Sequence, residues 1–227
     1  MKRLLWWRRP PADPIAAAYA VGTARKVGAR TPVDSLRFVV LDAETSGFRV
    51  GSDRLLSLAT VPVQAGRIPL GAIRSWLFRQ TTVPLNQATE VHGILPAEAA
   101  GGESEESILR EVLAELTGAV VVGHHIGFDL AVLDEATRRH FGLRLRNASI
   151  DTANLAMRVV EAFAATAYPG QRPPTLEELC SHCGVPLIDR HTAAGDAYTT
   201  AELFLVLCAR QQRLLGRPLT AGDLGLR

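Results

Sequence analysis

The stretch Val40-Leu-Asp-Ala-Glu-Thr-Ser-Gly47 decides how the rest of the sequence is interpreted. It closes a short apolar run, 38–41, that is typical of a buried strand. Asp42 and Glu44 stand two positions apart on an extended chain, so their side chains point to the same face. Neighbouring carboxylates repel one another at a strand end unless a cation joins them or water solvates them. The stretch therefore predicts either an exposed strand end or a site for Mg²⁺ or Mn²⁺.

Two later segments carry carboxylates at places where helices begin. In Val122-Gly-His-His-Ile-Gly-Phe-Asp129, a second apolar strand ends and a helix starts near Asp129. In His191-Thr-Ala-Ala-Gly-Asp196, the histidine lies in the loop before the last long helix, and Asp196 lies on its first turns. The simpler interpretations are a carboxylate that favours a helix N-terminus and a solvent-exposed histidine. Beside metal carboxylates, His191 is also a candidate general base for water, because imidazole changes charge near neutral pH.

Other polar motifs have structural interpretations. Asp13 and Asp151 are each expected to cap the helix that starts after them. Cys180-Ser-His-Cys183 has the spacing of half a zinc site, but no second pair at zinc-finger spacing accompanies it. We therefore expect a short core helix that stops at Gly184.

The chain predicts an α/β fold. Strands are expected at 38–41, 55–63, 73–78, 119–122 and 149–150, and helices at 14–26, 104–116, 128–141, 151–164, 176–183 and 193–215. The first three strands can form an antiparallel meander, and an α-β-α-β succession follows. This order predicts a mixed five-stranded sheet, three antiparallel strands and then two parallel ones, flanked by helices. We expect an N-terminal extension with a helix at 1–34, a main domain at 35–215 and a short tail at 216–227.

Composition narrows the class of protein. The chain has 227 residues, of which 47% are hydrophobic and 21% charged, and its net charge is +2. That balance favours a globular domain, and no apolar run approaches the ~20 residues needed to span a bilayer. The basic, proline-interrupted start does not match a secretory signal. We expect a cytoplasmic protein without membrane contact.

The ordered motifs D-x-E-T-(T/S)-G, H-x-x-x-F-D and H-x-A-x-x-D resemble those of the DEDDh exonuclease family, over roughly 38–208. That family includes the proofreading epsilon subunit of bacterial DNA polymerase III and oligoribonuclease. The resemblance implies a ribonuclease-H-like fold. It also implies metal-dependent 3′→5′ hydrolysis of single-stranded nucleic acid, with DNA favoured, to nucleoside 5′-monophosphates.

The resemblance also implies roles for single residues. Two Mg²⁺ or Mn²⁺ ions would be held by four carboxylates, those of Asp42, Glu44, Asp129 and Asp196, and His191 would accept the proton of the attacking water. Three residues would contact the substrate, namely Thr45, His92 and His125. The chain departs from the usual motifs twice. Ser46 replaces a threonine but keeps the hydroxyl, and His125 replaces an asparagine that supports the site by hydrogen bonding.

Other interpretations stay open at this level. The enzyme would trim RNA or clear short oligonucleotides if its pocket accepts the 2′-hydroxyl. A non-catalytic nucleic-acid-binding module is less favoured, because all four carboxylates and the histidine are present. The N-terminal extension, with Trp6 and Trp7, would dock a polymerase or another protein, contact nucleic acid, or most simply pack on the same chain. The oligomeric state is not predicted.

Overall fold

One mixed sheet organises the protein. The computed structural model describes residues 11–82, 87–164 and 171–226. The five strands are β1 (Arg37–Thr45), β2 (Leu55–Gln64), β3 (Arg74–Leu77), β4 (Val120–Gly123) and β5 (Ser149–Asp151). Their order across the sheet is β3-β2-β1-β4-β5. Antiparallel pairing joins β1 to β2 and β2 to β3, whereas β4 runs parallel to both β1 and β5. The predicted sheet is confirmed.

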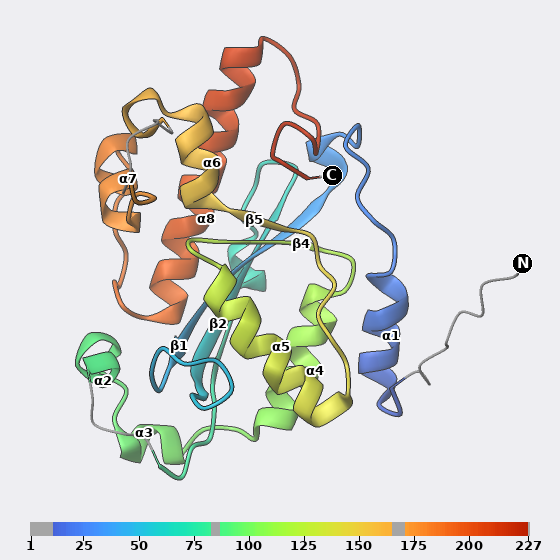
Figure 1. The fold of residues 1–227 in the computed structure, drawn as a ribbon, viewed down its shortest axis with the longest axis vertical. Coiled ribbons are helices and arrows are strands. Elements are labelled where there is room, and N and C mark those ends of the chain that lie inside the picture. The colour runs from blue at the N-terminus through green and yellow to red at the C-terminus, as the bar shows by residue number, and fades with distance from the viewer. Residues whose placement is uncertain (1–10, 83–86, 165–170, 227) are drawn as a thin grey trace, which may run out of the picture.

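Helices cover both faces of the sheet (Figure 1). One layer holds α1 (Pro14–Gly22), α4 (Glu105–Leu116) and α5 (Gly127–Phe141), and the other holds α6 (Thr152–Val159), α7 (Leu176–Cys183) and α8 (Ala193–Leu215). Two short helices that the sequence did not predict, α2 (Gln87–His92) and α3 (Pro96–Ala100), lie between β3 and α4. Single 3-10 turns occupy Val33–Ser35, Leu70–Ala72 and Glu161–Phe163.

The pleat of β1 decides which face the acidic pair occupies. Phe38 and Val40 belong to the core beneath α8, whereas Val39 and Leu41 belong to the core beneath α4. All four side chains are buried, as expected for a central strand covered on both faces. Because the period of a strand is two, Asp42 and Glu44 continue the row that faces α8.

Small residues let α8 lie close to the sheet. Ala193, Ala197 and Ala201 recur at four-residue spacing and are almost fully buried. Further along the helix, the Phe204 ring packs edge-on against Phe38, with 5.1 Å between the ring centroids. The first turn of α8, which carries Asp196, is thereby brought to the sheet at the acidic end of β1.

Two predicted helix ends are wrong. The first helix ends at Gly22 rather than near residue 26, because the Thr23 hydroxyl accepts a hydrogen bond from the Gly118 N–H at 3.1 Å. The helix expected at 151–164 ends at Val159, because Val160 is extended and both valines turn into the core. The predicted caps at Asp13 and Asp151 are confirmed, as is the helix 176–183 ending at Gly184.

Both chain ends pack on the domain over their described parts. Tyr19 of α1 is fully buried, and its hydroxyl donates to the Asn147 side chain at 2.5 Å. Asp13 pairs with Arg110 of α4 at 2.7 Å. After α8, three leucines are buried in the core beneath that helix: Leu219, Leu224 and Leu226. Trp6 and Trp7, by contrast, lie outside the described residues. Over the described ranges, no helix is long and apolar enough to cross a membrane.

Candidate active site

Three carboxylates from two distant segments meet at the end of β1. Asp42, Glu44 and Asp196 each offer an oxygen, and these oxygens lie within 4.8 Å of one another. The two β1 residues are half-buried and Asp196 is buried. The sheet register changes between Glu44 and Thr45, and such irregularities commonly re-aim side chains next to active sites.

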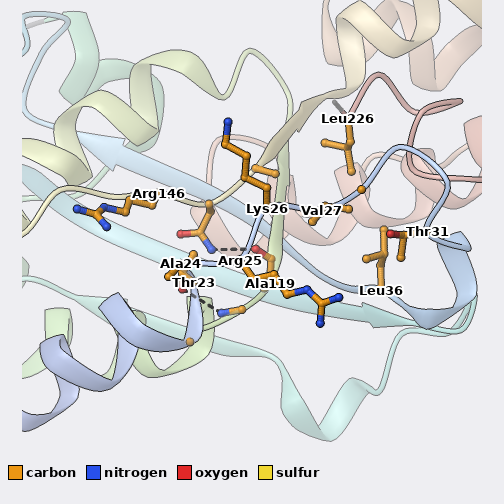
Figure 2. A pocket seen from close by; sticks show the side chains of 15 residues that line it. Thr23, Ala24, Arg25, Lys26, Val27, Thr31, Leu36, Ala119, Arg146 and Leu226 are labelled. Carbon is orange, nitrogen blue, oxygen red and sulfur yellow. Dashed lines mark hydrogen bonds between the residues drawn. The ribbon is translucent and has the colours of Figure 1, made fainter. Parts of the chain in front are cut away.

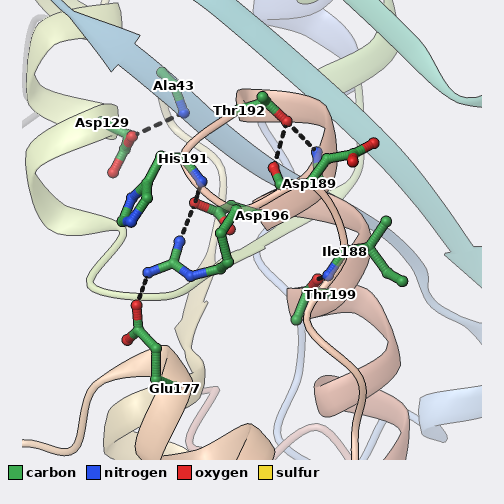
Figure 3. Close-up of polar contacts among 11 residues, drawn as sticks. Ala43, Asp129, Glu177, Ile188, Asp189, His191, Thr192, Asp196 and Thr199 are labelled. Carbon is green, nitrogen blue, oxygen red and sulfur yellow. Dashed lines mark hydrogen bonds and ion pairs between the residues drawn. The ribbon is translucent and has the colours of Figure 1, made fainter. Parts of the chain in front are cut away.

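Asp129 approaches the same place from the opposite layer. It lies in the first turn of α5, just after β4 ends parallel to β1. Its Oδ1 accepts a hydrogen bond from the backbone N–H of Ala43 at 3.1 Å, so it lies against the strand between Asp42 and Glu44 (Figure 3). The carboxyl ends of parallel strands are the usual ligand edge of an α/β sheet. All four predicted carboxylates therefore converge there.

Burial and mutual repulsion make this cluster hold protons. Burial raises the pKa of Asp42 well above its ordinary range, and the charges of Asp129 and Glu44 raise it further. Burial, then Asp196 and Asp129, raises the pKa of Glu44 to about 7. Burial likewise raises the pKa of Asp129 to about 7. Without cations, the folded site therefore retains protons that exposed carboxyls lose near pH 4.

Protein kept in a chelator is expected to lose thermal stability as the pH rises from about 6.5 to about 8. The folded pKa values of Glu44 and Asp129 lie above the unfolded values, so stability is present at low pH and is lost as these groups deprotonate. The loss is about 1 kcal/mol per group, or a few degrees of melting temperature for a chain of this size. Thermal unfolding in EDTA at both pH values measures it.

Two controls accompany that measurement. Mg²⁺ added at the higher pH should restore the lost stability, because it binds the charged carboxylates only in the folded protein. The variant Glu44→Gln should show a shallower pH dependence, since one of the proton-holding groups is gone. Equal melting temperatures of the wild-type protein at both pH values would contradict the expected repulsion.

His191 lies in a constrained loop before α8 (Figure 3). Asp189 and His191 have φ of 39° and 65°, in the left-handed region. A Cβ at Gly195 would collide with the carbonyl oxygens of Ile188 and Asp189, so the loop packs tightly on the first turn of α8. The backbone N–H of His191 donates to Asp196 Oδ2 at 3.2 Å. The loop thus joins the predicted base to a carboxylate of the cluster.

Thr45 and His92 lie together beside the end of β1. The Thr45 hydroxyl is buried and donates to the Gly47 carbonyl at 2.7 Å. His92 Nδ1 accepts a hydrogen bond from the Ile94 N–H at 3.0 Å, so a neutral ring carries its proton on Nε2. Burial lowers the pKa of His92, and the adjacent Thr45 backbone opposes this shift. Both predicted contact residues therefore have hydrogen-bonded side chains beside the end of β1.

The backbone at His125 explains why asparagine is usual there. Its φ is 54°, a conformation in which asparagine, aspartate and histidine are enriched. The His125 N–H donates to Asp151 Oδ1 at 3.3 Å, and its ring packs edge-on against His124. Burial lowers the pKa of His124 to about 4, and the neighbouring His125 adds to this. Histidine thus fits the backbone that the motif requires.

The sequence did not single out Arg190 and Glu177. Arg190 forms ion pairs with Asp196 and with Glu177, which lies in the first turn of α7. Arg190 immediately precedes His191, and a cluster of carboxylates needs a nearby cation. The position of Arg190 next to His191 in the sequence could therefore have marked it as a site residue. The pairing with Glu177 could not be read from the chain, because α7 and the loop meet only in the folded protein.

A separate cavity of about 830 Å³ lies at the other end of the sheet (Figure 2). Its lining includes Arg25, Lys26 and Arg146, together with Leu36 and Ala119, which stand just before β1 and β4. It therefore opens at the amino ends of the parallel strands, away from the carboxylates. None of the predicted site residues lines it.

Comparisons with known proteins agree with this arrangement. The family model described as exonuclease matches residues 39–204. DNA polymerase III subunit epsilon of Aquifex aeolicus is 30% identical over 168 residues, which cover 74% of this chain and 78% of that relative. The DNA polymerase III subunit epsilon-like protein of Rhodobacter capsulatus is 32% identical over 182 residues. This match covers 79% of this chain but only 25% of that relative, so the chain spans a quarter of its length.

The fold has solved counterparts. The crystal structure of E. coli Exonuclease I in complex with a dT13 oligonucleotide superposes with a TM-score of 0.66 at 21% identity. The match covers 80% of this chain and 43% of that one, and at this identity it speaks for the fold alone. Family match, relatives and fold agree, and the chain belongs to the DEDDh-type 3′→5′ exonucleases of the ribonuclease-H-like fold.

Proposed function

We propose that the protein removes nucleotides from the 3′ end of single-stranded nucleic acid, with DNA favoured, and releases nucleoside 5′-monophosphates. The observation that carries the proposal is the convergence of Asp42, Glu44 and Asp196 within 4.8 Å. The Asp129 carboxylate accepts a hydrogen bond from the backbone N–H of Ala43, which stands between Asp42 and Glu44. The named relatives, one a DNA polymerase III subunit epsilon and the other an epsilon-like protein, support DNA as the substrate class.

The residues fit two divalent ions, Mg²⁺ or Mn²⁺. The donors are all carboxylate oxygens, which hard cations prefer. Asp196 Oδ1 is buried, and within the described ranges it has no hydrogen-bond partner. Metal binding would release protons from Glu44 and Asp129, because the pKa values of both carboxyls are raised. When bound, such a pair supplies electrostatic stabilisation of the attacking and leaving oxygens.

The chain's own residues supply positioning and proton transfer. His191 accepts the proton of the attacking water in this proposal. Its backbone N–H bonds to Asp196, so the residue stands next to a carboxylate of the cluster. Thr45 and His92 lie at the end of β1, where the terminal nucleotide must rest for its phosphate to reach the carboxylates. His125, in the loop between β4 and α5, would also contact the substrate.

The experiment is a digestion of 5′-labelled single strands by pure protein with Mg²⁺ or Mn²⁺. The expected result is a ladder that shortens from the 3′ end, with 5′-monophosphates as the released products. Matched DNA, RNA and dinucleotide substrates rank the substrate classes, and faster RNA or dinucleotide cleavage would move the assignment to those classes. No cleavage with either ion would refute the proposal.

A further inference from the structure

Arg190 lies between two carboxylates at the N-termini of two helices. Its guanidinium pairs with Asp196 in the first turn of α8 and with Glu177 in the first turn of α7. Figure 3 draws both ion pairs. The Arg190 side chain is only 22% exposed. A planar guanidinium can serve two carboxylates at once, which a lysine ammonium does less well.

The two oxygens of Asp196 have different surroundings. Oδ2 accepts from the Arg190 guanidinium and from the backbone N–H of His191. Oδ1 is buried and, among the residues that the structure describes, receives no hydrogen bond. Leaving a buried polar oxygen without a hydrogen-bond partner is unfavourable, because the oxygen loses its contacts with water and gains none in return. The pattern is that of a carboxylate with one oxygen held by the protein and one reserved for a ligand.

The backbone places Arg190 with little freedom. It lies between Asp189 and His191, both of which have left-handed backbone angles. The Thr192 hydroxyl donates to the Asp189 carbonyl at 2.7 Å. The loop carbonyls also pack directly on Gly195. The backbone at Arg190 is therefore constrained by its neighbours, and its guanidinium has two ion-pair partners.

We propose that Arg190, anchored by Glu177, is a positioning residue that orients Asp196 so that Oδ1 faces the divalent ion. The inference rests on the proposed function, in which Asp196 is a metal ligand. A competing interpretation predicts the opposite effect on metal affinity. The positive charge of Arg190 beside the cluster would repel an incoming ion and weaken its binding. The geometry favours orientation. Arg190 occupies only Oδ2, and within the described ranges no ion pair links it to Asp42 or Glu44.

The test measures Mn²⁺ binding to the free protein. The electron paramagnetic resonance signal of unbound Mn²⁺ reports how much of the ion is bound. Loss of a partner that orients a metal ligand typically weakens binding by about 10–100-fold. We expect that range for Arg190→Gln, a smaller loss in the same direction for Glu177→Gln, and partial recovery for Arg190→Lys. The activity of Arg190→Gln should return towards the wild-type value as Mn²⁺ is raised, because the defect lies in binding.

Arg172→Gln is the matched control. Arg172 pairs with Glu178 next to Glu177 on α7, but neither residue contacts a carboxylate of the cluster. This variant should bind Mn²⁺ as the wild type does. Unchanged or tighter Mn²⁺ binding by both Arg190→Gln and Glu177→Gln would overturn the proposal in favour of simple charge repulsion. Absence of Mn²⁺ binding by the wild-type protein would instead refute the proposed function itself.

Discussion

Replacing Asp42 by asparagine is expected to abolish strand hydrolysis while leaving the domain folded. Asparagine keeps the shape of the side chain but loses the charge that binds a cation. Metal ions contribute several kcal/mol of charge stabilisation to such reactions. Because each ~1.4 kcal/mol is a tenfold change in rate, turnover should fall by about 10³-fold or more. Initial rates on a labelled single strand at saturating Mn²⁺ measure the loss.

Stability separates this effect from unfolding. The raised pKa of Asp42 means that its charged form is unfavourable in the metal-free site, mainly through burial. Asp42→Asn should therefore melt at the same temperature as the wild type, or higher, in EDTA at alkaline pH. Asp34→Asn, at an exposed position, is the control and should change neither quantity. Retained hydrolysis by Asp42→Asn would contradict the assigned role as a ligand.

Replacing His191 by asparagine should lower turnover by about 10²–10⁴-fold, the usual contribution of a general base. Asparagine suits the test because φ at this position is 65°, and asparagine adopts left-handed backbone readily. Alanine would add backbone strain to the loss of the imidazole. Mn²⁺ affinity should persist, because only the backbone N–H of residue 191 bonds to Asp196. Single-turnover rates and Mn²⁺ titrations measure the two quantities separately.

His125→Asn is the matched control for that experiment. It is the same substitution at another left-handed position, where φ is 54°, and it restores the residue usual in DEDDh motifs. Its turnover should stay within a few-fold of the wild type. Equal losses in the two variants would show that disturbance of the loops, rather than removal of a base, lowers the rate.

Local patterns predicted much of the fold. The apolar runs, the turns between them and the caps at Asp13 and Asp151 depend on neighbouring residues only, and the strands and most helices followed from them. The two misplaced helix ends show where this fails. Gly22 and Val159 end their helices because Thr23 bonds to Gly118 and Val160 turns into the core. These contacts lie outside any local window of sequence.

For this protein, sequence alone determined where the strands lie along the chain, the acidic face of β1 and the resemblance to the family, because periodicity and motif order are properties of the chain. Only the tertiary structure decided how the carboxylates are used. Asp129 bonds to the backbone of Ala43, and Arg190 pairs with one oxygen of Asp196 while the other has no hydrogen-bond partner among the described residues. These contacts join α5, α7 and α8 to β1 across long stretches of chain. Such contacts form only when both layers of helices pack against one sheet.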